Sequence, residues 1–147
     1  MAETGWFVHE LRVRYAETDR MGVVHHTHYL TWFEAGRTEM IRSLGVTYEE
    51  IERMGLYLPL TESQVRYLQA ARYDDWLEIR TRPVHMTPLR LDFAYEVRRG
   101  EEKLAEGVTK HVWLNRDWKP VRLDKAAPEL YRMLERAAPF RTEDRRE

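Results

Sequence analysis

The sequence has no cysteine among its 147 residues. This absence excludes disulfide bonds, thiolate zinc sites and cysteine nucleophiles. No stretch approaches the roughly 18 consecutive apolar residues of a membrane-spanning helix. The first ten residues, MAETGWFVHE, contain no apolar run of the kind found in a signal peptide. We therefore expect a cytoplasmic protein without membrane insertion.

The sequence also lacks an excess of charge of either sign. It carries 24 Lys and Arg residues against 25 Asp and Glu residues, for a formal net charge of −1. Proteins that bind nucleic acids usually show a basic excess or patch, so we expect no nucleic-acid partner. The dinucleotide-binding motif GxGxxG, the P-loop motif GxxxxGK(S/T) and the serine-hydrolase motif GxSxG are absent as well.

One long amphipathic segment is the main feature that is present. After a half-buried strand expected over residues 6–15, the apolar residues take the period of a helix over residues 29–44. Thr27 is the expected N-cap of this helix and Gly45 its expected C-cap. Gly36 costs about 1 kcal/mol relative to Ala in a helix interior. Its presence indicates the close approach of another backbone.

The rest of the chain predicts an antiparallel sheet. A short helix over 46–54 is followed by strands expected over 58–69, 76–85, 89–97 and 104–114. Short turns between successive strands favour an antiparallel meander over βαβ crossovers. A C-terminal helix is expected over 126–138, and the polar tail 141–147 is expected to be frayed.

Alternation along the strands predicts which of their residues share a face. The predicted inward residues of one strand are Leu89, Leu91, Phe93, Tyr95 and Val97, and the last strand carries Val108, Val112 and Leu114 on one face. We expect the long helix to cover this sheet. The layout is therefore α+β, with a single domain over residues 1–147.

Asp19 lies in the loop between the first strand and the long helix. The first N–H groups of a helix have no intrahelical partner, and the helix dipole adds partial positive charge there. Together with a carboxylate that attacks a carbonyl or activates a water, they form a minimal acyl-transfer site. Because an Asp in such a place is more often a turn or cap residue, the residues alone leave both roles open.

Three histidines, His25, His26 and His28, cluster at the same junction. Zinc sites generally need three or four ligands in an arrangement that the fold sets. No HExxH motif and no second cluster accompanies these three, so we prefer hydrogen-bonding and exposed roles to a metal site. On the helix, Glu34 and Arg37 have the spacing of an i, i+3 ion pair.

The run VRYAETDRMGVVHHTHY, residues 13–29, resembles the signature of the hotdog-fold acyl-CoA thioesterases. It is similar to the 4-hydroxybenzoyl-CoA thioesterase branch, which includes the Tol-Pal-associated thioesterases. Their pattern is a strand, then D-x-x-G-x-V-x-x-x-x-Y, then a helix reading F-E-x-x-R-x-E. The matching residues are Asp19, Gly22, Val24, Tyr29, Phe33, Glu34, Arg37 and Glu39, and further on Tyr67, Ala71, Asp74, Asp75 and Leu77.

The resemblance implies a hotdog fold, in which a curved antiparallel sheet of about five strands wraps one long central helix, followed by a C-terminal helix. It also implies a homo-oligomer, with a dimer as the minimal unit and a tetramer as the full assembly. The implied activity is hydrolysis of a short-chain or aromatic acyl-CoA to the free acid and CoA. No metal and no organic cofactor is implied.

The resemblance also assigns roles to residues. Asp19 would be the nucleophile or the general base. The N–H groups at His26 and Thr27 would polarise the thioester carbonyl, and the His26 side chain would position the thioester or the water. The implied substrate-binding residues are Gly22, Val24 and Tyr29, Glu62 and Arg66 of the partner subunit along the acyl pocket, and Arg90 at a CoA phosphate.

Two classes of function stay open at this point. The first is a thioester hydrolase, and the second is a non-catalytic module of the same fold that binds acyl-CoA or an acyl carrier. Asp19 favours the enzyme, because a binding module has no need of a carboxylate at the carbonyl. A hydratase on a related hotdog fold would need an Asp–His pair further along the chain, and neither His85 nor His111 has an obvious acidic partner in the sequence.

Overall fold

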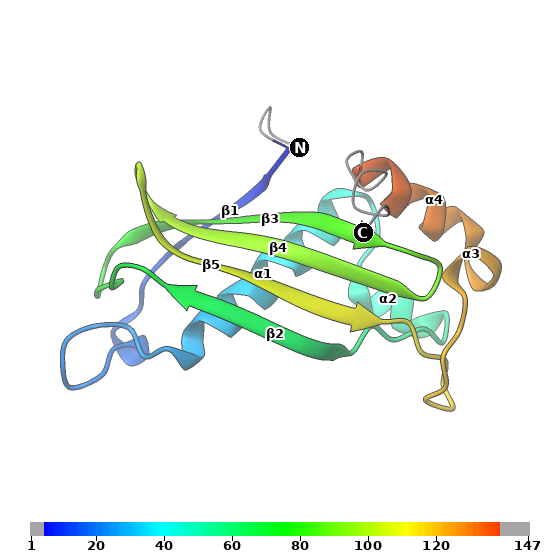
Figure 1. Cartoon of the computed structure of the whole chain (residues 1–147), viewed down its shortest axis with the longest axis horizontal. Coiled ribbons are helices and arrows are strands. Elements are labelled where there is room, and N and C mark those ends of the chain that lie inside the picture. The colour runs from blue at the N-terminus through cyan, green and yellow to red at the C-terminus, as the bar shows by residue number, and fades with distance from the viewer. Residues whose placement is uncertain (1–4, 139–147) are drawn as a thin grey trace.

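The computed structural model describes residues 5–138. Its elements follow in the order β1 (Phe7–Arg12), the 3-10 turn η1 (Tyr15–Glu17), α1 (Thr27–Ser43), α2 (Tyr48–Arg53), β2 (Leu60–Tyr67), β3 (Trp76–Met86), β4 (Arg90–Arg99), β5 (Glu102–Val112), α3 (Leu123–Ala126) and α4 (Pro128–Ala137). Within these residues the strands form one five-stranded antiparallel sheet in the order β1-β3-β4-β5-β2. Helix α1 runs along one face of that sheet (Figure 1), which confirms the predicted α+β layout.

The observed boundaries differ from the predicted ones by a few residues. Helix α1 has His26 at its N-cap position, so Thr27 is the first helical residue rather than the cap. Gly45 follows the helix with φ of 107°, a conformation that glycine adopts without strain. The C-terminal helix divides into α3 and α4 at Ala127, and the tail 141–147 lies outside the described residues. Between residues 5 and 138, no helix is long and apolar enough to span a membrane.

The hydrophobic core lies between α1 and the inner face of the sheet. Residues three or four apart along α1 are buried, as expected of an amphipathic helix. Phe33 stacks on Tyr95 with 4.2 Å between the ring centroids. The predicted inward residues of β4 are confirmed, except that Leu89 precedes the strand and is exposed. The main buried side chains are Tyr29, Trp32, Phe33, Met40, Ile41, Leu77, Ile79, Leu91, Phe93, Tyr95 and Val97.

Two glycines allow α1 to lie close to the sheet. A Cβ atom at Gly36 would collide with Thr81 Oγ1 and would lie 3.0 Å from Ile79 Cγ2. A Cβ atom at Gly107 on β5 would lie 2.5 Å from Phe33 Cε2. The close approach predicted at Gly36 is therefore present, and it is made by side chains of β3 rather than by a backbone.

The inner face of β5 carries two polar residues, Thr109 and His111. The register against β4 pairs Thr109 with Phe93 and His111 with Leu91. Thr109 and His111 are consequently buried, whereas Val108 belongs to the outer face and is half-buried. The alternation places Val108 and Val112 on one face without assigning that face to the core, and the two inward polar residues can be buried because they hydrogen-bond to each other.

The donor and the acceptor of each of these hydrogen bonds can be assigned. His111 Nδ1 lies 3.2 Å from the Leu58 carbonyl oxygen, and Nε2 lies 2.8 Å from Thr109 Oγ1. Burial and the positive charge of Arg37 lower the pKa of His111 from 6.5 to about 4, so the ring is neutral at neutral pH. A neutral ring that donates from Nδ1 must accept at Nε2. Thr109 therefore donates to His111, and Tyr95, 2.6 Å away, donates to Thr109.

Arg37 completes this chain of hydrogen bonds. Its Nη1 donates to the Tyr95 hydroxyl at 3.4 Å. The predicted ion pair with Glu34 does not form in the described part of the chain, because the guanidinium group turns toward the sheet. An i, i+3 pair stabilises a helix by only about 0.2–0.5 kcal/mol, so tertiary contacts decide where this side chain points.

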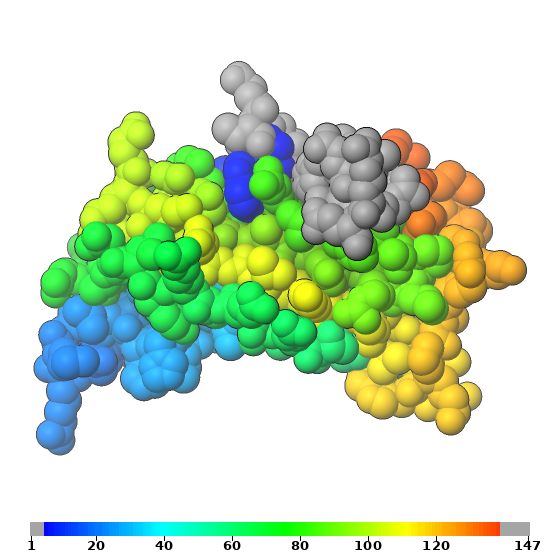
Figure 2. Space-filling model, viewed as in Figure 1, coloured from blue at the N-terminus to red at the C-terminus, as the bar shows by residue number. Residues whose placement is uncertain are grey.

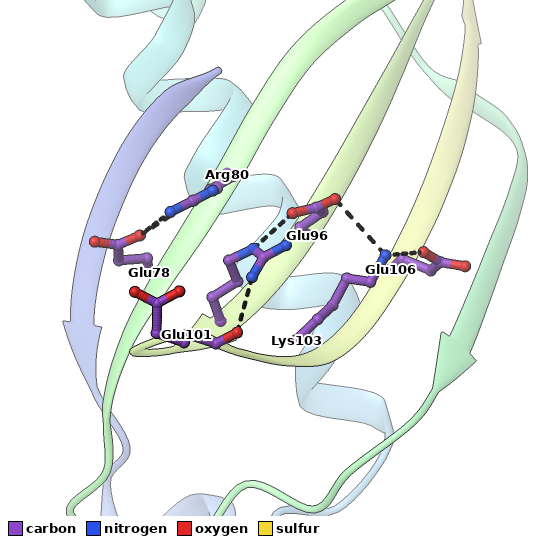
Figure 3. A network of polar contacts seen from close by, with 7 residues as sticks. Glu78, Arg80, Glu96, Glu101, Lys103 and Glu106 are labelled. Atoms are coloured by element: carbon purple, nitrogen blue, oxygen red, sulfur yellow. Dashed lines mark hydrogen bonds and ion pairs between the residues drawn. The ribbon is translucent and has the colours of Figure 1, made fainter. Parts of the chain in front are cut away.

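The outer face of the sheet carries paired charges. Glu78 and Arg80 on β3 lie 2.9 Å apart. Lys103 on β5 lies 2.8 Å from Glu106 and 3.8 Å from Glu96 on β4 (Figure 3). Residues of β2 and β5 lie open at the surface in the view of Figure 2. Exposed pairs of this kind contribute about 0–1 kcal/mol each, so the helix-covered face supplies most of the stability.

We predict that His111 makes the stability of the fold depend on pH. Its pKa is about 4 in the folded chain, against 6.5 for an ordinary His. Between these values only the unfolded chain binds the proton, so the stabilisation is fully present above pH 6.5 and is lost as the pH falls toward 4. We expect the free energy of unfolding in urea to fall by about 1–2 kcal/mol between pH 6.5 and 5 on this account.

The variant His111→Gln should lose most of this pH dependence. His9→Gln, on the edge strand β1, is the matched control, and its free energy of unfolding should change with pH as that of the wild type does. If the free energy of unfolding of His111→Gln also changes with pH as in the wild type, the prediction is contradicted.

Candidate active site

The chain passes from β1 to α1 through a loop that folds back on itself. The N–H of Asp19 donates to the Val23 carbonyl at 2.9 Å, and the N–H of Gly22 donates to the Asp19 carbonyl at 3.0 Å. Gly22 has φ of 82°, which suits this tight turn. Asp19 Oδ1 accepts the Met21 N–H at 2.9 Å. The turn therefore holds the carboxylate in place, and Asp19 Oδ2 has no hydrogen bond to another residue within 5–138.

Glu17 fastens this loop to α1. Its carboxylate is buried; Oε1 accepts the Arg14 N–H at 2.8 Å and Oε2 accepts Trp32 Nε1–H at 3.0 Å. Its backbone carbonyl accepts the His25 N–H at 3.0 Å. A buried carboxylate requires such partners. Nothing in the sequence indicates this role, since Glu17 is recognisable there only as part of an acidic turn.

The N-terminus of α1 is capped by a histidine ring and leaves one N–H group open. His25 Nδ1 lies 2.9 Å from Thr27 Oγ1 and accepts the Thr27 N–H at 3.3 Å. The N–H of His26 has no hydrogen-bond partner in the described chain. Partial positive charge from the helix dipole adds to this open donor, so a carbonyl oxygen or an oxyanion would be stabilised beside it.

The segment after β2 forms the opposite wall. Arg99 Nη1 donates to Asp75 Oδ2 at 2.6 Å and to the Ala70 carbonyl at 3.3 Å. Hydrogen bonds to Glu102 and Asp75 raise the pKa of Arg99, so its guanidinium stays charged and holds this segment. Asp75 matched the family pattern in the sequence, but nothing there indicated its partner on β4.

These walls enclose a cavity of about 370 Å³. Four of the predicted site residues border it, namely Asp19, Val24, His26 and Tyr29. The other lining residues are Met21, Val23, Tyr67, Leu68, Gln69 and Ala70. The carboxylate of Asp19 and the start of α1 thus meet at one cavity, although seven positions separate Asp19 from His26 in the sequence.

Aromatic side chains form the floor of this cavity. The Tyr67 hydroxyl donates to the His26 carbonyl at 3.4 Å, and its ring meets that of Tyr29 edge-on at 5.1 Å. Burial raises the pKa of Tyr29, so its hydroxyl stays protonated and does not compete with Asp19 as a base. Tyr67 matched the family pattern, but its place at the cavity depends on the end of β2 lying beside α1.

The other predicted site residues lie outside this lining. Gly22 forms the turn next to it, and Thr27 begins the helix beneath it. Glu62 and Arg66 lie on the exposed strand β2, where they alternate with Val65, which packs on the core. Arg66 pairs with Glu106 at 3.5 Å on the outer face of the sheet.

Arg90 begins β4, at the end of the sheet away from the residue 18–25 loop (Figure 1). Near the same end, His85 Nδ1 lies 3.7 Å from Asp92 Oδ2, so the acidic partner of His85 that the sequence did not indicate is present. This pair is not part of the cavity beside Asp19. Among the described residues, no three His, Asp or Glu side chains are grouped as ligands for a metal ion.

Comparison with known proteins identifies the family to which this chain belongs. The thioesterase-like superfamily matches residues 13–143. The protein YneP of Bacillus subtilis (strain 168) is 30% identical over 130 residues, which cover 87% of this chain and 94% of YneP. The acyl-CoA thioester hydrolase YbgC of Escherichia coli O157:H7 is 33% identical over 94 residues, which cover 64% of this chain and 70% of YbgC.

A solved structure extends the likeness to the whole fold. The DHNA-CoA thioesterase from Staphylococcus aureus is 31% identical and superposes with a TM-score of 0.88, over 95% of this chain and 95% of that one. The matched residues include the Asp19 loop, α1 and β2 to β5. The resemblance first carried by the run 13–29 is therefore confirmed. The chain belongs to the thioesterase-like superfamily and has its hotdog fold.

Proposed function

We propose that this protein hydrolyses the thioester bond of an acyl-CoA, with Asp19 and the start of α1 as its catalytic groups. The observation that carries the proposal is the meeting of the Asp19 carboxylate and the open N–H of His26 at one cavity. The carboxylate supplies a base or nucleophile, and the N–H supplies an oxyanion donor. The acyl-CoA thioester hydrolase YbgC and the DHNA-CoA thioesterase among its relatives support the reaction class.

In the general-base form of the reaction, Asp19 takes a proton from a water molecule whose oxygen attacks the carbonyl carbon. The carbonyl oxygen becomes negative and accepts the His26 N–H. Collapse of the tetrahedral intermediate breaks the C–S bond, and the departing thiolate of CoA receives the proton from Asp19. In the nucleophilic form, Asp19 attacks the carbonyl carbon, the C–S bond breaks and the thiolate of CoA leaves, and water then hydrolyses the resulting mixed anhydride to the free acid and the Asp19 carboxylate.

The cavity favours a short or aromatic acyl group. Apolar and aromatic side chains, including Val24, Tyr29 and Tyr67, surround the position facing Asp19, and the volume of about 370 Å³ is at the small end for ligand sites. A non-catalytic acyl-CoA-binding module is the alternative. It would use the same cavity but would make no use of the carboxylate.

We propose further that the working unit is a dimer built through β2. This strand is at an edge of the sheet, and seven of its eight residues are exposed. An uncovered edge strand offers unpaired N–H and C=O groups to another strand. Antiparallel pairing with β2 of a second copy would cover these groups and continue the sheet. A tetramer, a cytoplasmic location and a single domain over 1–147 stay predictions.

We predict that Asp19→Asn lowers kcat/KM for a panel of acyl-CoAs by about 10²–10⁴-fold, the range expected for loss of a general base. The amide keeps the shape and the Met21 hydrogen bond, so the fold and acyl-CoA binding should persist. Release of free thiol measures the rate. Asp117→Asn, in the exposed turn after β5, is the matched control and should be fully active.

The outcome separates the two function classes. A wild-type protein that binds acyl-CoAs and hydrolyses none of them would establish the binding module. Equal rates for wild type and Asp19→Asn would show that another group is the base.

We predict that Ser63→Lys dissociates the dimer. Ser63 lies near the middle of β2, so antiparallel pairing about the strand centre places the two new charges next to each other, where like charges destabilise a strand pair. Light scattering after size exclusion should show a shift from dimer to monomer. Ser43→Lys, at the exposed end of α1 where a cation is favourable, should stay dimeric. A Ser63→Lys protein with the mass of wild type would exclude β2 as the interface.

A further inference from the structure

A second cavity, of about 420 Å³, lies along α1 beyond the start of β2. Its lining residues are Glu34, Arg37, Thr38, Tyr48, Glu52, Tyr57, Leu58, Pro59 and Trp118. None of them borders the cavity beside Asp19. Tyr57 and Trp118 form an aromatic side of it, with their rings tilted by 51° and 5.7 Å between the ring centroids.

Arg37 brings a positive charge into this cavity without a balancing carboxylate. Its guanidinium is half-buried; it donates to the Tyr95 hydroxyl at 3.4 Å and also interacts with the Tyr48 hydroxyl, and neither of these partners is an anion. Guanidinium carries five N–H donors in a planar fork that matches a carboxylate. A partly buried cation without an anionic partner is unfavourable, so the site has unused capacity for an anion.

The groups of the sheet that Arg37 faces cannot supply that anion. The chain of hydrogen bonds runs from Arg37 through Tyr95 and Thr109 to a neutral His111, and every group in it is already paired. The charge of Arg37 therefore stays directed at the cavity. Glu34 and Glu52 are exposed at the rim, where water and salt screen their charge.

Tyr48 adds a second donor. Its hydroxyl oxygen is buried, and no residue within 5–138 meets the geometry of a hydrogen bond to it. Burial raises the pKa of Tyr48 to about 12, although the guanidinium of Arg37 opposes the rise, both through its charge and through a hydrogen-bonding contact whose geometry is poor. The hydroxyl is therefore protonated at neutral pH. Buried polar groups are rarely left unpaired, and this one lies at the wall of the same cavity as Arg37.

We infer that the cavity between α1, α2 and Trp118 binds a carboxylate group, held by the Arg37 guanidinium and the Tyr48 hydroxyl. Both groups are donors, and their ligand must therefore present acceptor oxygens. A carboxylate satisfies both and neutralises the charge of Arg37. The rings of Tyr57 and Trp118 suit the apolar body of an organic acid.

The carboxylate has two possible sources, which share this chemistry. One is a free organic acid. The other is the far end of an acyl group whose thioester lies at Asp19 of the partner subunit; this source rests on the proposed function and on the β2 dimer. Antiparallel pairing of β2 would bring this cavity, at the start of β2, beside the cavity at the end of β2 in the partner.

Titration calorimetry with benzoate tests the binding of a free acid, with benzamide as the uncharged probe. We expect benzoate to bind wild type and benzamide not to bind. Arg37→Gln should weaken benzoate binding about tenfold or more, as expected for loss of hydrogen bonds to a charged group. Tyr48→Phe should weaken it by a smaller factor with little loss of stability, because the deleted hydroxyl makes no hydrogen bond of good geometry to a residue within 5–138. Arg53→Gln, on the exposed side of α2, should bind benzoate as wild type does.

Hydrolysis of glutaryl-CoA against valeryl-CoA tests the acyl source. These acyl groups have the same chain length and differ in the terminal carboxylate. A ratio of kcat/KM that favours glutaryl-CoA in wild type and falls about tenfold in Arg37→Gln assigns the carboxylate to the substrate. If benzoate binding depends on Arg37 but the glutaryl to valeryl ratio of kcat/KM is the same in wild type and Arg37→Gln, the bound carboxylate belongs to a free acid.

The inference would be overturned if both tests failed. In the first, benzoate would not bind, or would bind Arg37→Gln and Tyr48→Phe as it binds wild type. In the second, neither variant would change the ratio of kcat/KM for glutaryl-CoA to valeryl-CoA. A protein that hydrolyses no acyl-CoA would remove the proposed function, but the benzoate titration would still decide whether the cavity binds a carboxylate.

Discussion

The close packing of α1 on the sheet is the constraint on which the rest of the structure depends. Gly36 and Gly107 allow the helix to lie directly on the side chains of β3 and β5, and any Cβ atom there would force them apart. Because a helix is rigid, this contact fixes its whole length. Its N-terminus then faces the loop that carries Asp19, and Arg37, next to Gly36, is turned toward Tyr95.

The position of Asp19 depends on contacts that the core does not provide. Glu17 links the loop to α1 through Trp32, and Asp75 links the opposite wall to Arg99. Each is a charged group whose partner lies 15 or more positions away in the sequence. Periodicity reports which residues face a core, but it carries no information on such pairs. The place of Asp19 was predictable because strand period gives way to helix period just after it, whereas the groups that hold it were not.

The same distinction applies to the faces of β5. Alternation places Val108 and Val112 on one face without assigning that face to the core, and a shift of one residue exchanges the two faces of a strand. The observed register places Thr109 and His111 inside, where a hydrogen-bonded chain to Tyr95 removes the cost of burying them. Local rules succeeded for the helix and for the antiparallel run β3-β4-β5 with its turns, but the predicted meander did not extend to β2, which pairs with β5 rather than β3. They failed where buried polar groups find partners on other elements.

The two cavities explain why assembly and selectivity would depend on each other. Within one chain they lie at opposite ends of β2, a strand of eight residues that spans roughly 26 Å. An acyl group of five or six carbons cannot reach across that distance. Antiparallel pairing of β2 with its copy would remove the separation, since the start of one strand then lies beside the end of the other. In that arrangement Arg37 of one subunit would bind the far end of the acyl group whose thioester we propose Asp19 of the other subunit hydrolyses. Loss of strand pairing would then abolish selectivity for a distal carboxylate, even in a protein whose two cavities are individually intact.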